Sequence, residues 1–259
     1  MNITVCVKQV PDTWSERTLR PADSTVDRDA ADPVINELDE FAIEEGLLLT
    51  EKLGGEVTIL SMGPDRATES IRKALSMGAA RGVHVCDEAL HGSDALVTSA
   101  VLAAALARNP FDLVILGSES TDARTGMLAA MLAERLGLPQ LTFASQVDTD
   151  GQQITVRRLA EYGYDVVEAG LPAVVSVVEK INEPRYPSFK GIMAAKKKPV
   201  DVLSLGDLSL DPSQAGLAAS ATVVGGFAQR PPRQAGTIVT DEGEGGVGAA
   251  EFLATGKFI

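Results

Sequence analysis

Along the first 145 residues, short apolar runs alternate with longer stretches in which apolar residues return every three or four positions. The short runs favour buried strands and the longer stretches favour amphipathic helices, because strand side chains alternate and helical side chains return to one face about every 3.6 residues. This pattern predicts strands at 3–10, 56–64, 82–87 and 111–117 and helices at 36–53, 65–79, 93–109 and 125–137. The regular alternation of strand and helix predicts a parallel sheet covered by helices on both faces.

Four residues mark expected helix ends. We expect Asp65 and Ser93 to cap the second and third helices at their N-termini. Gly78 and Gly137 are expected to end the second and fourth helices, because glycine readily adopts the backbone conformation that follows a last helical turn.

The pattern changes after Leu141. Strand-like runs follow as far as Lys180, with Asp150-Gly151 as a hairpin turn, and we expect them to extend the sheet in an antiparallel sense. From residue 201 onward glycine, proline and serine dominate, with isolated apolar runs at 237–240 and 250–259. Such a segment cannot easily build its own core, so we expect an α/β domain at 1–200 and an extended arm at 201–259 that wraps a partner.

Composition limits the possible functions. The net charge of −13 argues against nucleic-acid binding, which requires a basic surface. The longest apolar run is too short to span a bilayer, and the N-terminus lacks the shape of a signal peptide. Cys6 and Cys86 are lone thiols far apart in the sequence, which fits a reducing compartment, so we expect a cytoplasmic protein. The sequence has no His, Cys and Asp cluster with zinc spacing and no GxSxG motif, so we expect neither a metal site nor a set of catalytic side chains. These features are more typical of a carrier or binding subunit than of a hydrolase.

The carboxyl ends of the expected strands are the candidate binding region, because ligands of open α/β sheets bind there. The first strand ends at Lys8–Val10 and the second at Ser61–Pro64, while the fourth leads into the loop Gly117–Gly126. This loop has glycines at both ends, several hydroxyl side chains and a helix behind it, so it fits a phosphate cradle. It fits equally a polar loop that only caps the helix, and its spacing matches neither the Walker A motif nor GxGxxG.

The segment 183–199, EPRYPSFKGIMAAKKKP, is unusual in an acidic chain because it ends in a run of lysines. Pro184 and Pro187 restrict its backbone, so we expect a partly preorganised loop.

Residues 156–199 resemble the signature region of the electron transfer flavoprotein β-subunit family, through the strings LPAV, INEPRYPS and IMAAKKK. Further strings agree along almost the whole chain: VKQVPDT at 7–13, NELDEFAIEE at 36–45, ALSMGAARGVHV at 74–85 and LGSESTD at 116–122. The resemblance implies a Rossmann-like, nucleotide-binding α/β domain of the adenine nucleotide α-hydrolase type, with added antiparallel strands and an extended C-terminal arm.

The resemblance also implies a function. The family forms a heterodimer with an α-subunit that holds most of one FAD, and the β-subunit buries a structural AMP. Electrons pass from the acyl-CoA dehydrogenases of fatty acid β-oxidation, and from related dehydrogenases, through the flavin to a membrane quinone oxidoreductase. The β-subunit is then an electron-carrier subunit without catalytic residues of its own, because the cofactor does the redox chemistry, and its arm wraps the α-subunit.

The resemblance carries two groups of residues over by position. The AMP-binding positions are Cys6, Asn36, Glu37, Leu38, Asp39, Met62, Gly117, Ser118, Glu119, Ser120, Thr121, Asp122, Arg124, Thr125 and Gly126. The positions that contact a partner dehydrogenase are Pro184, Arg185, Tyr186, Pro187, Phe189, Ile192, Met193, Lys196, Lys197 and Lys198. Phe189 is the expected apolar anchor; the alternative is that it packs into the core of this chain, as most phenylalanines do.

Two further alternatives stay open. The start KQVPDT also occurs in relatives that carry a second FAD in place of AMP and bifurcate electrons, so a second FAD is the alternative cofactor. The alternative function is a stand-alone adenine-nucleotide-binding sensor of the same architecture.

Overall fold

The computed structural model describes residues 1–229, 231–232, 236, 238 and 240–258 of the chain. It divides into two compact units, Met1–Gly225 and Gly226–Ile259. Of the apolar runs expected in the arm, Thr237, Val239 and Ile259 lie outside the described residues.

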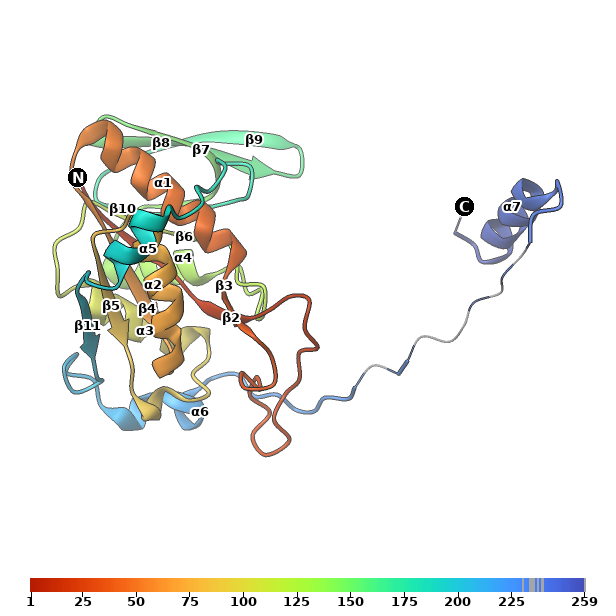
Figure 1. Ribbon diagram of the computed structural model, residues 1–259, viewed down its shortest axis with the longest axis horizontal. Coiled ribbons are helices and arrows are strands. Elements are labelled where there is room, and N and C mark those ends of the chain that lie inside the picture. The colour runs from red at the N-terminus through yellow and green to blue at the C-terminus, as the bar shows by residue number, and fades with distance from the viewer. Residues whose placement is uncertain (230, 233–235, 237, 239, 259) are drawn as a thin grey trace. The chain divides into compact units, whose positions relative to one another are not determined.

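The first unit is built on a mostly parallel sheet (Figure 1). Among the described residues the sheet has nine strands, in the order β11-β5-β4-β1-β6-β10-β7-β8-β9. Their bounds are β1 Asn2–Cys6, β4 Glu56–Met62, β5 Arg81–Val85, β6 Leu113–Gly117, β7 Gln140–Thr149, β8 Gln153–Ala160, β9 Gly163–Gly170, β10 Ala173–Val177 and β11 Val200–Leu203. All neighbours from β11 to β7 are parallel, which confirms the predicted fold class.

The strands after Leu141 differ in part from the expectation of an antiparallel extension. Only β8 and β9 extend the sheet antiparallel to their neighbours, and Asp150 shapes the hairpin between β7 and β8 by accepting hydrogen bonds from the N–H groups of Gln152 and Gln153. β10 instead inserts between β6 and β7 and runs parallel to both. Every residue of its AVVSV sequence is buried, which is typical of a strand inside a parallel sheet.

The first predicted strand, 3–10, is divided in the structure. After β1 the chain leaves the sheet and forms β2 (Gln9–Pro11), which pairs antiparallel with β3 (Pro33–Ile35). The break falls at Lys8, whose N–H donates to the carboxylate of Asp39 and whose carbonyl accepts from the N–H of Asn36. The start of the following helix therefore takes the hydrogen bonds that a continued strand would have made.

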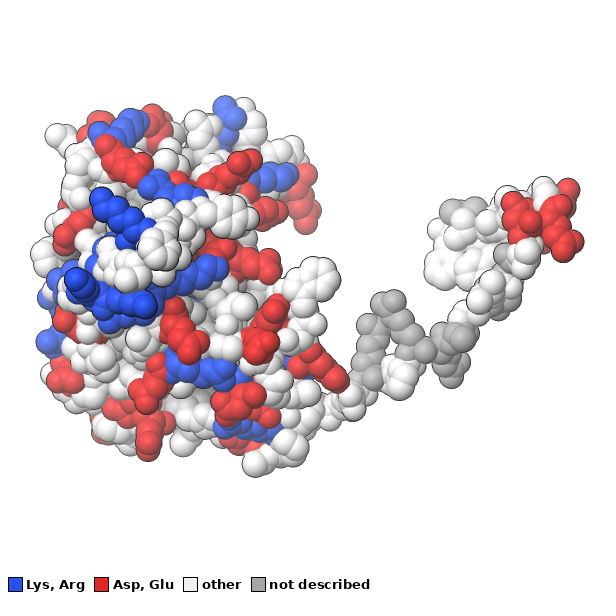
Figure 2. All heavy atoms as spheres, in the orientation of Figure 1, with Lys and Arg blue, Asp and Glu red and all other residues white. Residues whose placement is uncertain are grey.

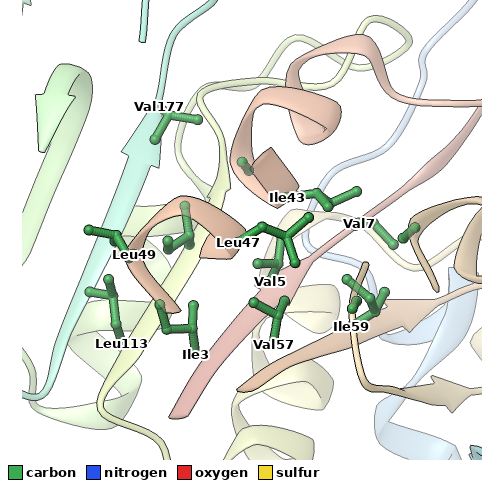
Figure 3. Close-up of a cluster of buried hydrophobic side chains, with 14 of the residues drawn as sticks. Ile3, Val5, Val7, Ile43, Leu47, Leu49, Val57, Ile59, Leu113 and Val177 are labelled. Atoms are coloured by element: carbon green, nitrogen blue, oxygen red, sulfur yellow. The ribbon is translucent and has the colours of Figure 1, made fainter. Parts of the chain in front are cut away.

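Helices cover both faces of the sheet (Figure 1). α1 (Glu37–Leu53) and α2 (Thr68–Met77) lie on one face, and α3 (Ala95–Leu106) and α4 (Leu128–Leu136) lie on the other. Alternate residues of each central strand serve the two faces: Figure 3 shows Ile3 and Val5 of β1 against Ile43 and Leu47 of α1, while Cys6 of β1 belongs to the cluster under α3 and α4. Shorter helices are α5 (Phe189–Ala195) and α6 (Gly216–Ala219).

Two of the four predicted helix ends are confirmed. Gly78 and Gly137 follow the last residues of α2 and α4 with positive φ angles of 148° and 65°. Asp94, not Ser93, caps α3 by accepting a hydrogen bond from the N–H of Val97. Asp65 does not cap α2, because it opens a short 3-10 turn (Asp65–Ala67) that precedes the helix.

The compact unit continues past residue 200, where we expected the arm to begin. β11 pairs with β5 at the edge of the sheet, and Leu205 is fully buried. Farther on, the carboxylate of Asp94 accepts hydrogen bonds from the N–H groups of Ala221 and Thr222. Residues 201–225 therefore belong to the α/β unit, and the pairing of β11 was hidden because an exposed four-residue edge strand has little sequence signal.

The second unit contains α7 (Gly245–Thr255), and none of the residues of this helix is buried. Phe252 stacks on Phe258 with 6.2 Å between ring centroids, and both side chains remain exposed. Among the described residues, no helix combines the length and the apolar character that crossing a membrane requires.

A pair of truncations tests this division of the chain. Ending the chain after Gly225 should leave its melting temperature nearly unchanged. Ending it after Leu208 removes buried Ala215 and the contacts to Asp94, at a cost of about 2 kcal/mol. The melting temperature should then fall by roughly 4–8 °C. Thermal unfolding by circular dichroism is the measurement, and equal melting temperatures for the two truncated chains would contradict the assignment.

Candidate functional site

The candidate nucleotide site lies where the carboxyl ends of β1, β4 and β6 meet the start of α1. Asn36 connects the start of α1 with the loop that follows β6. Its amide nitrogen Nδ2 donates to Asp39 Oδ1 and to the carbonyl of Glu119, both at 3.0 Å. Its amide oxygen accepts from the N–H of Thr121 at 3.0 Å. One buried side chain therefore holds the loop Gly117–Gly126 against the helix.

Asp39 joins three segments through its carboxylate. Oδ2 accepts from the N–H of Lys8 at 2.7 Å, and Oδ1 accepts from the N–H of Gly117 at 3.2 Å as well as from Asn36. Burial raises the pKa of Asp39 to about 7, although the hydrogen bonds from Asn36, Lys8 and Gly117 act in the opposite direction. β1, β6 and the start of α1 are thus fastened to a single carboxylate.

Gly117 permits the close approach of α1 to β6. A Cβ at this position would lie 2.6 Å from Asp39 Oδ1 and 2.7 Å from the Cβ of Leu38. Neither group can move away freely, because Leu38 belongs to the helix backbone and Asp39 is held by its hydrogen bonds. The glycine is therefore required by space and not by its φ angle.

Charged side chains gather over the loop. Lys8 Nζ lies 2.7 Å from Asp122 Oδ1, and Arg28 lies 3.5 Å from the other oxygen of that carboxylate. Burial alone would raise the pKa of Asp122, but the charge and hydrogen bond of Lys8, together with Ser120 and Arg28, hold the pKa below its ordinary value. Lys8 and Arg28 thus face the same carboxylate, and Arg17 also donates to the carbonyl of Thr121, so three basic side chains gather over the loop.

The loop offers fewer backbone donors than a simple phosphate cradle would. The N–H groups of Gly117, Ser118 and Thr121 already donate to acceptors inside the chain. At the far end of the loop, α4 begins without a side-chain cap on its first turn, which leaves its N-terminal dipole available to an anion. Gly126, just before that helix, has a φ of 61°.

Two buried hydroxyl groups in this region have no hydrogen-bond partner among the described residues, namely Ser61 Oγ at the end of β4 and Thr121 Oγ1 in the loop. A buried hydroxyl without a partner is costly, so such groups mark places where a ligand can complete the bonding. Both lie in segments that contribute predicted AMP-binding positions.

The structure places some of the other predicted AMP-binding residues at this site and leaves others away from it. Glu37 and Leu38 lie beside Asn36 at the start of α1, and Met62 is half-buried at the end of β4. Cys6 is buried beneath α3 and α4, where burial raises the pKa of its thiol to about 12, so it is no reactive thiolate. Arg124 and Thr125 are exposed.

Sequence reasoning missed two of the cations. Arg17 and Arg28 come from the irregular segment between β2 and β3, which has no periodic pattern that would place it over the loop. Lys8 was noted as the end of a strand, and its pairing with Asp122 could not be inferred from the sequence, because the two residues lie far apart along the chain.

The second predicted site, 183–199, carries large exposed apolar side chains. Tyr186 is 96% exposed and Phe189 is 80% exposed, so Phe189 does not pack into the core of this chain. Ile192 and Met193 on α5 are also exposed. Figure 2 shows basic side chains around this apolar surface, and Lys196 and Lys197 are exposed beside it.

Two basic residues predicted to contact a partner are engaged within the chain. Arg185 forms ion pairs with Glu44 and Glu51 of α1. Lys198 Nζ donates to the carbonyls of Leu75 and Ala79 at the C-terminal end of α2, at 2.9 and 2.6 Å. Arg185 and Lys198 therefore hold the segment against α1 and α2. Lys196 and Lys197 are exposed, so their charges lie at the edge of the apolar surface.

Other features do not suggest a further site for chemistry. Among the described residues, no three His, Cys, Asp or Glu side chains are grouped so that they could hold a metal ion. A cavity of about 160 Å³ lies at the opposite, amino-terminal edge of the sheet, beside Thr58 and Arg81, away from the residues described above.

Comparison with known proteins gives a consistent result. Residues 23–208 match the profile of the Electron transfer flavoprotein domain. Electron transfer flavoprotein subunit beta of Mycobacterium tuberculosis is 51% identical over 264 aligned positions, covering 100% of this chain and 99% of that protein. The protein of the same name from Thermoanaerobacterium thermosaccharolyticum is 37% identical over 241 positions, covering 93% and 92%. Caffeyl-CoA reductase-Etf complex subunit CarD of Acetobacterium woodii is 36% identical over 242 positions, with the same coverage.

The close approach at Gly117 can be tested by substitution. Gly117→Ala should destabilise the chain by about 1–3 kcal/mol, because the added methyl group meets Asp39 and the backbone of α1. The melting temperature should fall by roughly 2–4 °C for each kcal/mol. Gly170→Ala is the matched control, since a Cβ there meets nothing within 4 Å. Similar melting temperatures for the two variants would show that α1 can retreat from β6.

The raised pKa of Asp39 predicts a pH dependence. Between its ordinary pKa of 3.8 and the folded value of about 7, the folded chain binds more protons at this site than the unfolded chain does. The contribution of this site to stability is therefore present at low pH and is lost as the pH rises through about 7. Urea denaturation of the wild type and of Asp39→Asn from pH 5 to pH 8 checks this: the stability difference between them should change over that window, and a constant difference would contradict it.

Proposed function

Because the chain belongs to the electron transfer flavoprotein β-subunit family, we propose that it carries electrons as part of a heterodimer with an α-subunit that holds one FAD. The heterodimer accepts electrons from acyl-CoA dehydrogenases and related dehydrogenases and delivers them to a membrane quinone oxidoreductase, in the cytoplasm. The observation that carries this proposal is 51% identity, over the full length of the chain, to proteins named as β-subunits of electron transfer flavoproteins.

We assign a structural AMP to the site at the start of α1. Three observations support such a ligand: Lys8 and Arg28 bring positive charge to the loop, the hydroxyl of Thr121 has no hydrogen-bond partner among the described residues, and the first turn of α4 has no side-chain cap. An adenylate phosphate supplies the missing negative charge and acceptors. Asn36 and Asp39 then shape the site by holding the loop and do not themselves need to bind the phosphate.

The chain's own part in the electron transfer is to bind and to orient. FAD supplies the redox chemistry when it is bound. The cationic side chains over the loop Gly117–Gly126 hold the nucleotide, and the apolar surface of Tyr186, Phe189, Ile192 and Met193 docks the electron-donating dehydrogenase. Lys196 and Lys197 assist the encounter through their charge and contribute little to affinity.

The second unit is proposed to wrap the α-subunit. α7 has no buried residue although Val247, Phe252 and Leu253 are apolar. A helix of 11 residues without a packed face is marginal in water, so its order is best explained by a surface supplied by the partner.

A second FAD in place of AMP is the alternative cofactor. Its support is the KQVPDT start at 8–13, which resembles that of relatives with a second FAD. A stand-alone nucleotide sensor has weaker support, because the relatives reported above are named as subunits over the same length.

Cofactor extraction decides between AMP and FAD. The chain should be co-expressed with its α-subunit, the complex purified, and the cofactors released by heat and quantified by chromatography. We expect one FAD and one AMP for each heterodimer. Two FAD and no AMP would overturn the assignment of AMP to this chain, and a colourless monomer that ignores the α-subunit would favour the sensor.

Docking through Phe189 has a kinetic signature. Phe189→Ala should raise the KM for the electron-donating acyl-CoA dehydrogenase at least tenfold, since a buried aromatic anchor contributes about 2–4 kcal/mol and about 1.4 kcal/mol corresponds to one decade. FAD content and melting temperature should not change, because the side chain is 80% exposed in this chain. Tyr162→Ala is a control, as Tyr162 is an aromatic side chain of equal exposure on the β8–β9 hairpin. A normal KM for Phe189→Ala would refute docking through this residue.

A further inference from the structure

The segment 183–199 is fastened to the first unit on both sides of its apolar surface. On the N-terminal side Arg185 binds α1. On the C-terminal side Lys198 binds the end of α2, and Arg72 of α2 donates back to the carbonyls of Ala195 and Lys198, both at 2.7 Å. In the middle, a Cβ on Gly191 would lie 2.5 Å from the carbonyl oxygen of Ser76, so α5 approaches α2 as closely as a glycine allows.

The contact between Arg185 and Glu44 is the strongest of these fastenings by its geometry. Glu44 is only 5% exposed. Its carboxylate accepts from Arg185 Nε at 2.7 Å, from Nη2 at 2.9 Å and from the backbone N–H at 3.1 Å. Glu51, which is more exposed, accepts from Nη1 at 2.6 Å. A bidentate pairing with a buried carboxylate fixes the orientation of the guanidinium group as well as its distance. The exposed pair with Glu51 contributes less to holding Arg185 in place.

The pairing matters because the contacts of Arg72 and Lys198 hold α5 at its C-terminal end, whereas Phe189 lies at its first residue, nearer to Arg185. α5 has seven residues and buries only Ala195. A helix of this length is not stable in water by itself, so tertiary contacts set its position. Ser188 caps its first turn by accepting from the N–H of Gly191 at 3.0 Å, and Phe189 is its first residue. The backbone that Arg185 holds leads into this first turn, so the pairing contributes to the direction in which Phe189 points, together with the packing of α5 on α2.

We propose that Glu44 is a positioning residue for docking, which acts through Arg185 to present Phe189 and Tyr186 to the dehydrogenase in a fixed pose. This inference rests on the proposed docking function of the same segment. A preorganised pose lowers the conformational entropy lost on binding and so strengthens encounter-complex formation. It does not alter the flavin, so Glu44 affects the KM for the dehydrogenase and not kcat at saturation.

The experiment uses the complete flavin-loaded heterodimer and an acyl-CoA dehydrogenase reduced by its own acyl-CoA substrate. Glu44→Gln retains the size of the side chain and removes the charge that attracts Arg185. We expect a KM for the dehydrogenase three- to tenfold above that of the wild type, with unchanged kcat and FAD content. Lys52→Ala is the matched control, because it removes an exposed ion pair with Asp148 elsewhere on α1 and should leave the KM within twofold of the wild type.

A double-mutant cycle distinguishes positioning from general stability. If Glu44 acts by presenting Phe189, Glu44→Gln should have little further effect on KM in a Phe189→Ala background. Amide hydrogen exchange supplies an independent readout, since the N–H of Arg185 should lose protection in Glu44→Gln while the amides of β1 and β6 should not. Should Glu44→Gln fail to fold, the double variant Glu44→Gln/Arg185→Gln leaves no buried charge unpaired, since Glu51, which also loses its partner, is exposed, and it is expected to show the same rise in KM.

The outcomes separate the two proposals. A normal KM for Phe189→Ala would overturn the docking function itself. A raised KM for Phe189→Ala together with a normal KM for Glu44→Gln, or effects of the two substitutions that multiply in the double variant, would overturn the positioning role of Glu44 alone. A fall in melting temperature with unchanged KM would likewise assign Glu44 to stability only.

Discussion

The buried carboxylate of Asp39 is the contact on which the arrangement of the first unit depends. It turns the chain out of β1 at Lys8, holds the end of β6 at Gly117, and fixes the start of α1 between them. Burial of a carboxylate opposes its charged form, and here donors from three segments offset part of that cost. The same helix then carries Glu44 to the segment 183–199, so one rigid element connects the proposed nucleotide site with the proposed docking surface.

The regular part of the fold was predictable because its signal is local. Continuous apolar runs such as Leu113–Gly117 and AVVSV at 173–177 mark buried strands, and the periodicity of α1 marks a covering helix. The place of β10 between β6 and β7 was not predictable, because the order of strands in a sheet is decided by packing between distant segments. The same applies to β11, whose four residues show no strong pattern.

The candidate sites show the same division between local and distant information. Asn36, Asp39 and Gly117 could be identified from their position at element ends through the family resemblance, and the structure brings them into contact. That Arg185 and Lys198 face inward could not be read from the sequence, since an arginine beside exposed aromatic residues is as typical of a partner contact as of an internal one. Only the positions of Glu44 and of the α2 carbonyls distinguish the two.

The unpacked helix α7 has a consequence for the supply of this chain in a cell. Phe252, Leu253 and Phe258 form an exposed apolar surface at the end of the polypeptide, and such surfaces are what chaperones bind and proteases cut. If the α-subunit covers this end, as proposed above, copies of the chain made in excess of it would be removed first, and the steady level of the chain would follow that of the α-subunit.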